Sequence, residues 1–210
     1  MKLYSTVLNK IEDEQRIEKS RFITSVIPCE TVDDAECFFQ EIRQKYKDAA
    51  HNVPAMVLGD KFQLQWASDD GEPQGTAGAP IIKMLVSEGI TNIAVVVTRY
   101  FGGVKLGTGG LVRAYTSSVK KAVLSGVICD VEERICFECK MAYKEFNKLS
   151  AVDFREDVKI DEIQYSDNVY FRFSCKKNEE DACINRINGI TFGGEWLLKR
   201  SVTFIKIPRI

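Results

Sequence analysis

The segment from Gly89 to Cys129 combines basic side chains with a glycine-rich run and contains no aspartate or glutamate. The run Gly107-Thr108-Gly109-Gly110 stands at the start of a predicted helix, where free backbone N–H groups and the helix dipole favour an anion. Basic residues precede and follow the run, and charge-assisted hydrogen bonds from them would strengthen phosphate binding. The residues predicted to bind phosphate are Arg99, Lys105, Gly107, Gly109, Gly110 and Arg113.

Aromatic residues are interspersed in the same segment. Tyr100, Phe101 and Tyr115 could stack on bases, which together with the basic residues favours RNA as the partner. The glycine spacing matches neither the phosphate-binding loop of nucleotide hydrolases nor the dinucleotide fingerprint, so mononucleotide hydrolysis is disfavoured. The alternative is that the glycines serve only the tight backbone geometry of a strand-to-helix turn.

A second loop, residues 69–80, carries the acidic side chains Asp69, Asp70 and Glu72. Neighbouring carboxylates could bind Mg²⁺ or act as acid and base, although such residues are more often solvated turn formers. A further alternative is that the acidic and basic loops lie together and neutralise each other. His51 is the only histidine, and a turn or cap role is favoured over that of a general base.

Composition narrows the class of protein. The 210 residues carry 29 Lys+Arg and 30 Asp+Glu, which excludes a basic nucleic-acid coat, so any electrostatic partner must meet a local patch. Seven scattered cysteines favour reduced thiols in the cytosol. Cys136 and Cys139 would point to opposite faces of a strand, which disfavours a metal site between them. We expect no cofactor. Neither a signal peptide nor a membrane span is indicated. We predict a cytoplasmic protein.

The elements of the N-terminal half are predicted from hydrophobic spacing and turn residues. A strand over 16–27, with 4–11 as its hairpin partner, precedes a helix from Thr31 to Tyr46. Two short strands flank Gly59-Asp60-Lys61, and a helix over 80–87 follows the acidic loop. The continuously apolar run 92–98 predicts a strand buried on both faces, which leads through the second glycine-rich loop into a helix over 111–125.

The C-terminal half begins after the acidic run at 130–133, which we interpret as the domain boundary, giving domains 1–130 and 131–210. The predicted order is strand, helix, strand, strand, helix, strand, at residues 135–141, 143–155, 158–165, 169–176, 179–187 and 197–207. This βαββαβ order is typical of the ferredoxin-like arrangement, so the fold class is α+β.

Two long strings resemble the signature of the IMPACT/YigZ family. They are Asp69-Asp70-Gly71-Glu72-Pro73-Gln74-Gly75-Thr76-Ala77-Gly78 with Pro80, and the string from Val95 to Tyr115. Lys19-Ser20-Arg21-Phe22 also matches a family-like strand. One departure follows His51-Asn52: many relatives carry an aromatic-rich strand after a His-Cys or His-Asn pair, and this sequence reads Val53-Pro54-Ala55-Met56 there.

The resemblance implies an N-terminal domain like the second domain of ribosomal protein S5 and domain IV of elongation factor G. It also implies a C-terminal ferredoxin-like domain that resembles the later domains of that factor. Eukaryotic members of the family are associated with translational control through protein partners, whereas bacterial members have no settled biochemical activity. Fold analogy alone does not assign a function.

The sequence is compatible with three functions. The favoured one is a non-enzymatic cytosolic protein that binds RNA or the ribosome, without DNA specificity, and modulates translation. The second is a module that binds a regulatory protein through its exposed loop and C-terminal sheet. The third is a Mg²⁺-dependent phosphohydrolase or peptidase that uses Asp69, Asp70, Glu72 and His51.

Overall fold

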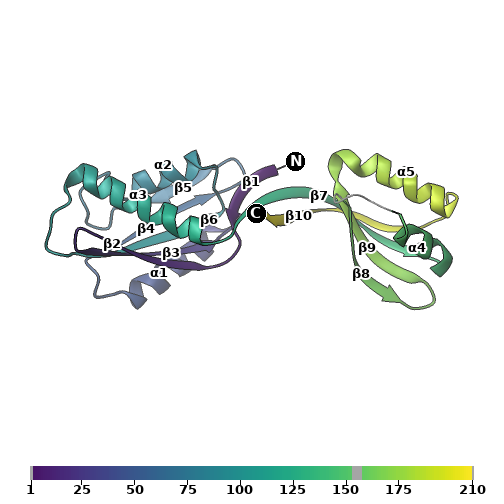
Figure 1. Cartoon of the computed structure of the whole chain (residues 1–210), viewed down its shortest axis with the longest axis horizontal. Helices are drawn as coiled ribbons and strands as arrows, with labels where there is room; N and C mark the ends of the chain where they lie inside the picture. The colour runs from purple at the N-terminus through teal and green to yellow at the C-terminus, as the bar shows by residue number, and fades with distance from the viewer. Residues whose placement is uncertain (1, 153–157, 210) are drawn as a thin grey trace. The chain divides into compact units, whose positions relative to one another are not determined.

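The computed structural model describes residues 2–152 and 158–209, which form a mixed α+β protein of two compact units (Figure 1). The N-terminal unit comprises Leu3–Val131 and Lys206–Ile210, and the C-terminal unit comprises Glu132–Ile205 with Met1–Lys2. The chain passes from one unit to the other along strand β7 (Ile128–Met141) and returns along strand β10 (Leu197–Pro208). Among the described residues, no helix is long and apolar enough to cross a membrane.

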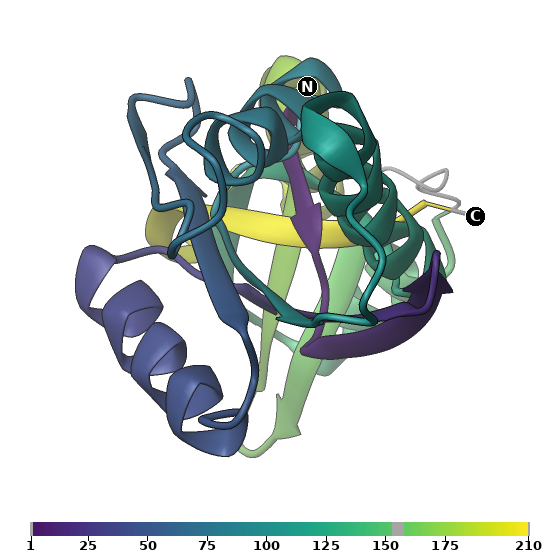
Figure 2. The ribbon, with the colours of Figure 1, turned by 90° about the vertical axis from the view of Figure 1, so that its left-hand side faces the viewer.

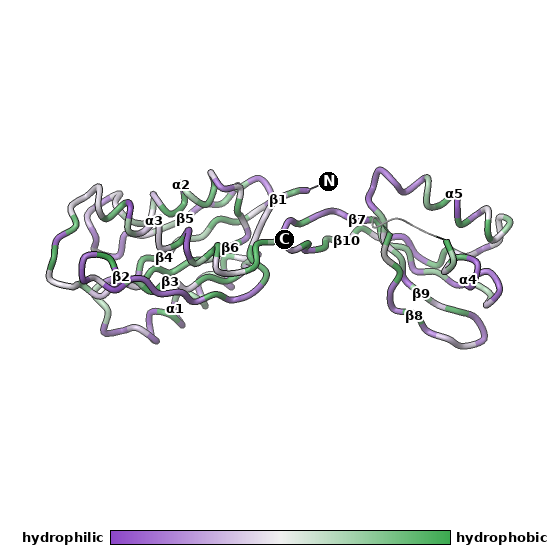
Figure 3. The backbone as a smooth tube through the Cα atoms, in the orientation of Figure 1, coloured by the Kyte–Doolittle hydropathy of each residue, from purple (hydrophilic) through white to green (hydrophobic). Residues whose placement is uncertain are grey.

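The N-terminal unit is built on an antiparallel sheet in the order β2-β3-β6-β4-β5. The strands are β2 (Ile11–Ile17), β3 (Ser20–Pro28), β4 (His51–Leu58), β5 (Leu64–Ala67) and β6 (Ile93–Tyr100). Helix α1 (Val32–Lys45) covers one face, while α2 (Gly78–Ser87) and α3 (Gly107–Ser125) cover the other (Figure 2). The predicted two-sided burial of β6 is confirmed, because Val95 and Val97 face α2 and α3 and Val96 faces α1. The central strands form the hydrophobic interior of the unit (Figure 3).

The first hairpin differs from the prediction. The expected single strand over 16–27 is divided by a two-residue turn at Glu18 and Lys19, whose φ angles of 45° and 67° lie in the left-handed region. Strand β2 pairs with β3 on the two sides of this turn, and β1 (Lys2–Val7) joins β7 in the other sheet. The prediction was wrong because the charged sequence of β2, IEDEQRI, lacks the apolar alternation of a recognisable strand.

Helix α1 begins where its sequence predicts, whereas α3 begins four residues before its predicted start at Leu111. The side chain of Thr31 accepts a hydrogen bond from the backbone of Asp34 and caps α1, as predicted. Helix α3 begins at Gly107, so the glycine-rich run lies inside its first turn. Gly107 has a φ angle of 68°, which a residue with a side chain adopts only with strain.

The C-terminal unit contains most of the second sheet, in which β10 and β9 (Val169–Lys176) pair with β7 and β8 (Lys159–Tyr165) pairs with β9. Phe137, Phe173 and Trp196 pack together in its core with residues of α4 (Tyr143–Ser150) and α5 (Glu180–Thr191). A short 3-10 helix, Lys177–Glu179, precedes α5. The helix predicted over 143–155 ends earlier, at Ser150, and residues 153–155 of that prediction lie outside the described residues.

The acidic run at 130–133 lies where the two units divide and belongs to a strand. It lies inside β7, where Cys129 and Val131 are buried and Asp130 and Glu132 are only partly covered. The alternation of a half-buried strand therefore accommodates the acidic side chains.

Candidate functional site

The two glycine-rich segments meet in a buried ion pair. Arg99, near the end of β6, donates from Nη1 to Oε1 of Glu72 at 2.6 Å, and both side chains are at least 95% buried. Tyr115 of α3 donates its hydroxyl to the same oxygen at 2.7 Å. The buried carboxylate thus joins the acidic loop, the central strand and the helix that carries the glycines.

This ion pair defines what Arg99 and Tyr115 can do. Arg99 faces Glu72 instead of solvent, so its charge is neutralised inside the protein and is not presented to a phosphate. Tyr115 is fully buried and cannot stack on a base. Burial, together with the hydrogen bond to Glu72, raises the pKa of Tyr115 well above its ordinary value. Of the alternatives drawn from the sequence, mutual neutralisation of the two loops describes these residues.

The other acidic side chains hold the loop itself. Asp69 accepts the backbone N–H groups of Gly75, Ala77 and Gly78 at 2.7 to 3.0 Å and so fixes the start of α2. Burial alone would raise the pKa of Asp69, but these three N–H groups outweigh it and lower the pKa. Asp70 accepts the backbone N–H of Asn52 at 2.6 Å. Both carboxylates are thus engaged in structural hydrogen bonds.

His51 begins β4 and lies against the same loop. Its Nδ1 is 2.7 Å from the carbonyl oxygen of Asp70, and its Nε2 is 3.8 Å from Oε1 of Glu72. Within the described part of the chain, no group of three His, Cys, Asp or Glu side chains is arranged to hold a metal ion. The cluster gives the loop a defined conformation without offering a set of metal ligands.

The basic residues of the acid-free segment divide into two groups. Lys120 pairs with Glu88 at 2.8 Å and Lys121 pairs with Asp13 at 2.9 Å, so acids from outside the segment neutralise both. Lys105 and Arg113 are exposed and form no ion pair among the described residues. The cationic surface that remains is therefore smaller than the sequence indicated.

Lys105 and Arg113 line a shallow groove beside the first turn of α3, hereafter the α3 groove. Gly110 also lines the groove, and Glu18 contributes one acidic side chain to the lining. The first turn of α3 contains no acidic residue and has no side-chain cap, so its N–H groups have no side-chain acceptor in the described structure.

Phe101, in the loop between β6 and α3, has an exposed aromatic side chain. About half of the residue, 52%, is accessible to solvent. Its ring lies 5.5 Å from the guanidinium carbon of Arg99, which also lies 5.5 Å from the ring of Phe22. Tyr100, in contrast, points to the other face of the sheet and donates its hydroxyl to Asp48 at 2.9 Å. The structure therefore separates the two aromatic residues predicted to act together.

The residues that hold Arg99 in place were not predicted from the sequence. Ser20 accepts from Nη2 of Arg99 at 3.3 Å and from the backbone N–H of Gly102 at 3.2 Å. Phe22 supplies the ring beneath Arg99. The only signal was the sequence Lys19-Ser20-Arg21-Phe22, which gave no indication that its alternate side chains meet Arg99.

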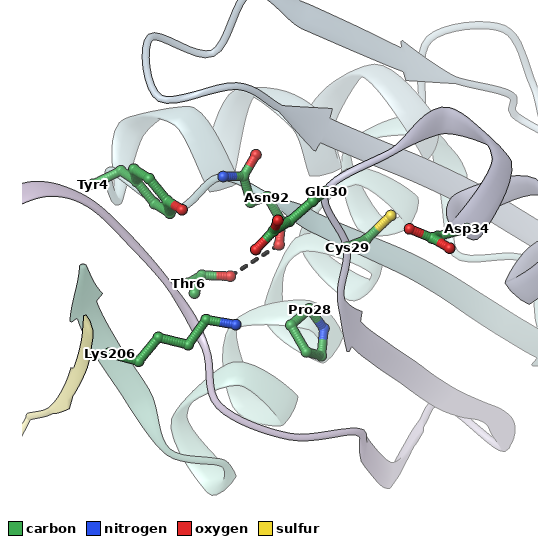
Figure 4. Close-up of a pocket in the computed structure, with 8 residues that line it drawn as sticks. All are labelled: Tyr4, Thr6, Pro28, Cys29, Glu30, Asp34, Asn92 and Lys206. Carbon is green, nitrogen blue, oxygen red and sulfur yellow. Dashed lines mark hydrogen bonds between the residues drawn. The ribbon is translucent and has the colours of Figure 1, made fainter. Parts of the chain in front are cut away.

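A separate pocket of the N-terminal unit holds none of the predicted site residues (Figure 4). Glu30, Asp34 and Lys206 line it, and the hydroxyl of Thr6 donates to the carbonyl oxygen of Asn92 at 2.9 Å. Cys29 also lines the pocket, and burial raises the pKa of its thiol, which keeps it protonated near neutral pH.

Comparison with known proteins gives consistent matches. The sequence model described as the Impact N-terminal domain matches residues 18–123. The chain is 34% identical over 203 residues to the IMPACT family member YvyE of Bacillus subtilis (strain 168), covering 97% of this chain and 94% of that relative. It is 45% identical over 111 residues to the IMPACT family member YigZ of Escherichia coli (strain K12), covering 52% of this chain and 54% of that relative. A crystal structure of a hypothetical protein superposes with a TM-score of 0.58 at 30% identity, covering 95% of this chain and 98% of the other.

Proposed function

The chain belongs to the IMPACT family, and on that premise we propose that it is a non-enzymatic cytosolic protein that binds RNA, free or in the ribosome, and modulates translation. The α3 groove and Phe101 form the proposed contact surface. One observation carries the proposal: the segment from Phe101 to Arg113 contains an exposed aromatic ring, two exposed cationic side chains without ion-pair partners among the described residues, and uncapped helical N–H groups.

Each of these groups suits a different part of a single-stranded nucleotide. Phe101 offers one face of its ring to a base, because the guanidinium of Arg99 supports the ring from within the protein. Lys105 and Arg113 offer charge to phosphates, and the first turn of α3 offers N–H donors. Nothing in this arrangement reads a base edge, so recognition would depend on the strand and not on its sequence.

Arg99 has an indirect role in this proposal. Its ion pair with Glu72 holds the guanidinium in place, and the guanidinium in turn supports Phe101. Tyr100 is assigned no direct base contact, because its hydroxyl is bound to Asp48. Asp69, Asp70 and Glu72 organise the loop that holds Arg99.

The fold supports a more specific relationship to translation proteins. In the C-terminal unit the elements follow the order β7-α4-β8-β9-α5-β10, and the strands lie in the order β10-β7-β9-β8. Both features fit a ferredoxin-like domain. On the family resemblance alone, we propose that the N-terminal unit is of the type of the second domain of ribosomal protein S5. The family resemblance links this pair of domains to elongation factor G and, through eukaryotic members, to translational control.

Binding of fluorescein-labelled decauridine, followed by anisotropy over a series of salt concentrations, tests the proposal. We expect the double variant Lys105→Ala/Arg113→Ala to lower the slope of log K against log salt by about 1.4, because two phosphate contacts are lost at roughly 0.7 each. Phe101→Ala should weaken binding by roughly tenfold with the slope unchanged, since stacking carries no counterion release.

The matched control is Lys120→Ala/Lys121→Ala. It removes two lysines of α3 that form ion pairs with Glu88 and Asp13. It should leave both affinity and slope close to those of the unaltered protein. Absence of binding at low salt, or equal effects of the two double variants, would refute the proposal. Sedimentation with ribosomes, before and after nuclease treatment, then distinguishes free RNA from the ribosome as the partner.

A further inference from the structure

The two edges of the N-terminal sheet differ sharply in charge. Edge strand β2 has the sequence IEDEQRI, in which four of seven residues are charged. Strand β5, at the other edge, has the sequence LQWA and no charged residue. Charged side chains on an edge strand discourage pairing with another chain. The β5 edge lacks this protection.

The hydrogen-bond pattern shows which backbone groups of β5 are available. Ser68 donates its N–H to the carbonyl oxygen of Pro54 at 3.2 Å, immediately beyond the paired residues Ala55 and Ala67. Because bonded and non-bonded pairs alternate along an antiparallel ladder, Trp66 and Leu64 also point their backbone groups toward β4. Gln65 and Ala67 consequently direct their N–H and C=O groups away from the sheet, where no described strand pairs with them.

Apolar surface flanks this edge on both faces. On one face lies an open groove between β5 and α2, lined by Gln65, Ala79, Ile82 and Val86. On the other face Trp66 is 46% exposed and stacks on Phe39 at 5.8 Å, with Leu64 beside it in β5. A strand laid along β5 would send alternate side chains to these two surfaces.

The groove also carries one charge. Lys83 of α2 lines it, is exposed, and forms no ion pair among the residues that the structure describes. An acidic side chain in the occupant would complement it. A second copy of β5 would bring Leu64, Gln65, Trp66 and Ala67 into the groove, none of which is acidic.

We infer that β5 is a docking strand for an extended peptide segment of another protein, with apolar residues on both faces and an acidic residue opposite Lys83. The segment adds to the sheet through the outward N–H and C=O groups of Gln65 and Ala67. Because β5 has four residues, the paired part of the segment is short. This site uses none of the residues of the α3 groove, so the inference is independent of RNA binding.

Selection of phage-displayed random heptapeptides on the full chain tests the inference and requires no candidate partner. We expect enriched peptides with alternating apolar residues and an acidic residue. Synthetic versions should bind with slower amide hydrogen exchange at Gln65 and Ala67, because those N–H groups become hydrogen-bonded. Lys83→Glu should shift the enriched peptides from acidic to basic residues.

The variant Gln65→Pro provides the backbone test. The N–H at this position points away from β4, so proline removes the outward donor while leaving the bonds to β4 in place. We expect affinity for the enriched peptides to fall by roughly tenfold or more. Thermal unfolding verifies that the variant is folded, and Lys83→Glu tests the site without altering the backbone.

Three outcomes would overturn the inference. The selection could enrich no peptide. The enriched peptides could bind Gln65→Pro and Lys83→Glu as tightly as the unaltered chain. Sedimentation could also reveal a dimer that Gln65→Pro dissociates, in which case a second copy of the chain, and not a separate peptide, occupies the edge.

Discussion

Glu72 is the residue on which the proposed site depends most. Its carboxylate accepts from both Arg99 and Tyr115 in a region where all three side chains are buried. Nε of Arg99 has no hydrogen-bond partner among the described residues, so the guanidinium relies on its remaining contacts. Removal of the carboxylate charge would leave the Arg99 cation in a poorly solvated environment.

The variant Glu72→Gln should therefore lower the free energy of unfolding of the N-terminal unit by about 3 to 5 kcal/mol, as expected when one partner of a buried pair is lost. Amide hydrogen exchange along β6 measures this loss for the N-terminal unit alone. Glu88→Gln is the matched control, because Glu88 pairs with Lys120 at the surface, and it should cost no more than about 1 kcal/mol. Similar losses in the two variants would contradict a structural role for the buried pair.

At the scale of elements, Gly102 and Gly109 differ in whether a side chain would fit at their positions. A side chain on Gly102 would lie 2.1 Å from the carbonyl group of Lys19 in the β2–β3 turn, a clash with backbone that no rotamer relieves. A side chain on Gly109 would meet only Nη1 of Arg113, at 3.8 Å. Glycine is thus required by packing at Gly102 but not at Gly109.

We predict that Gly109→Ala raises the free energy of unfolding by roughly 0.5 to 1 kcal/mol, because alanine favours a helix over glycine. The same variant should weaken decauridine binding, since the added methyl group obstructs the approach of a phosphate to the first turn of α3. Gly102→Ala should destabilise the unit. Urea unfolding and anisotropy measured on the same samples separate the two effects, and unchanged RNA affinity in Gly109→Ala would argue against a phosphate at that turn.

The sequence predicted those elements whose signals are local. The apolar run of β6 and the Thr31 cap of α1 depend on neighbouring residues, and both were recognised. The turn at Glu18 and Lys19 was missed because it contains neither glycine nor asparagine, which usually mark left-handed conformations. The acidic stretch at 130–133 was not recognised as part of strand β7 because its charges conceal the alternation of a strand.

The site was less predictable because its decisive contact is not local. The segment around Arg99 contains no acidic residue, which favoured an exposed cation, but Glu72 is 27 positions earlier in the sequence. In the sheet, Arg99 of β6 lies opposite Phe22 of β3 on one side and opposite His51 of β4 on the other. The same strand order brings the acidic loop, with Glu72, next to Arg99. Only the sheet topology places that carboxylate.

At the scale of the whole molecule, the N-terminal unit includes residues that follow the C-terminal unit in the sequence. Arg209 donates from its backbone to the carbonyl oxygen of Ile128 and from Nε to Oδ1 of Asp130, each at 2.8 Å. Ser5 donates to the same Asp130 oxygen, also at 2.8 Å. Three distant parts of the chain therefore meet at one carboxylate.

We expect Arg209→Ala to lower the free energy of unfolding of the N-terminal unit by about 1 kcal/mol, the usual range for a partly exposed charged hydrogen bond. Hydrogen exchange should accelerate at Ser5 and Ile128 and stay unchanged in α5. Arg200→Ala is the converse control, because Arg200 binds Glu180 inside the C-terminal unit. An effect of Arg209→Ala on both units alike would contradict this local assignment.

The return of β10 to the N-terminal unit also sets the order in which the protein can be completed during its own synthesis. Domains generally fold as units as the chain emerges, the N-terminal one first. Here residues 206–209 complete the contacts of the N-terminal unit, and the ribosome makes them only after the entire C-terminal unit. The first half of the chain to emerge is thus the last to be finished, and nascent chains arrested at Ile205 would carry an N-terminal unit that still lacks the contacts of residues 206–209.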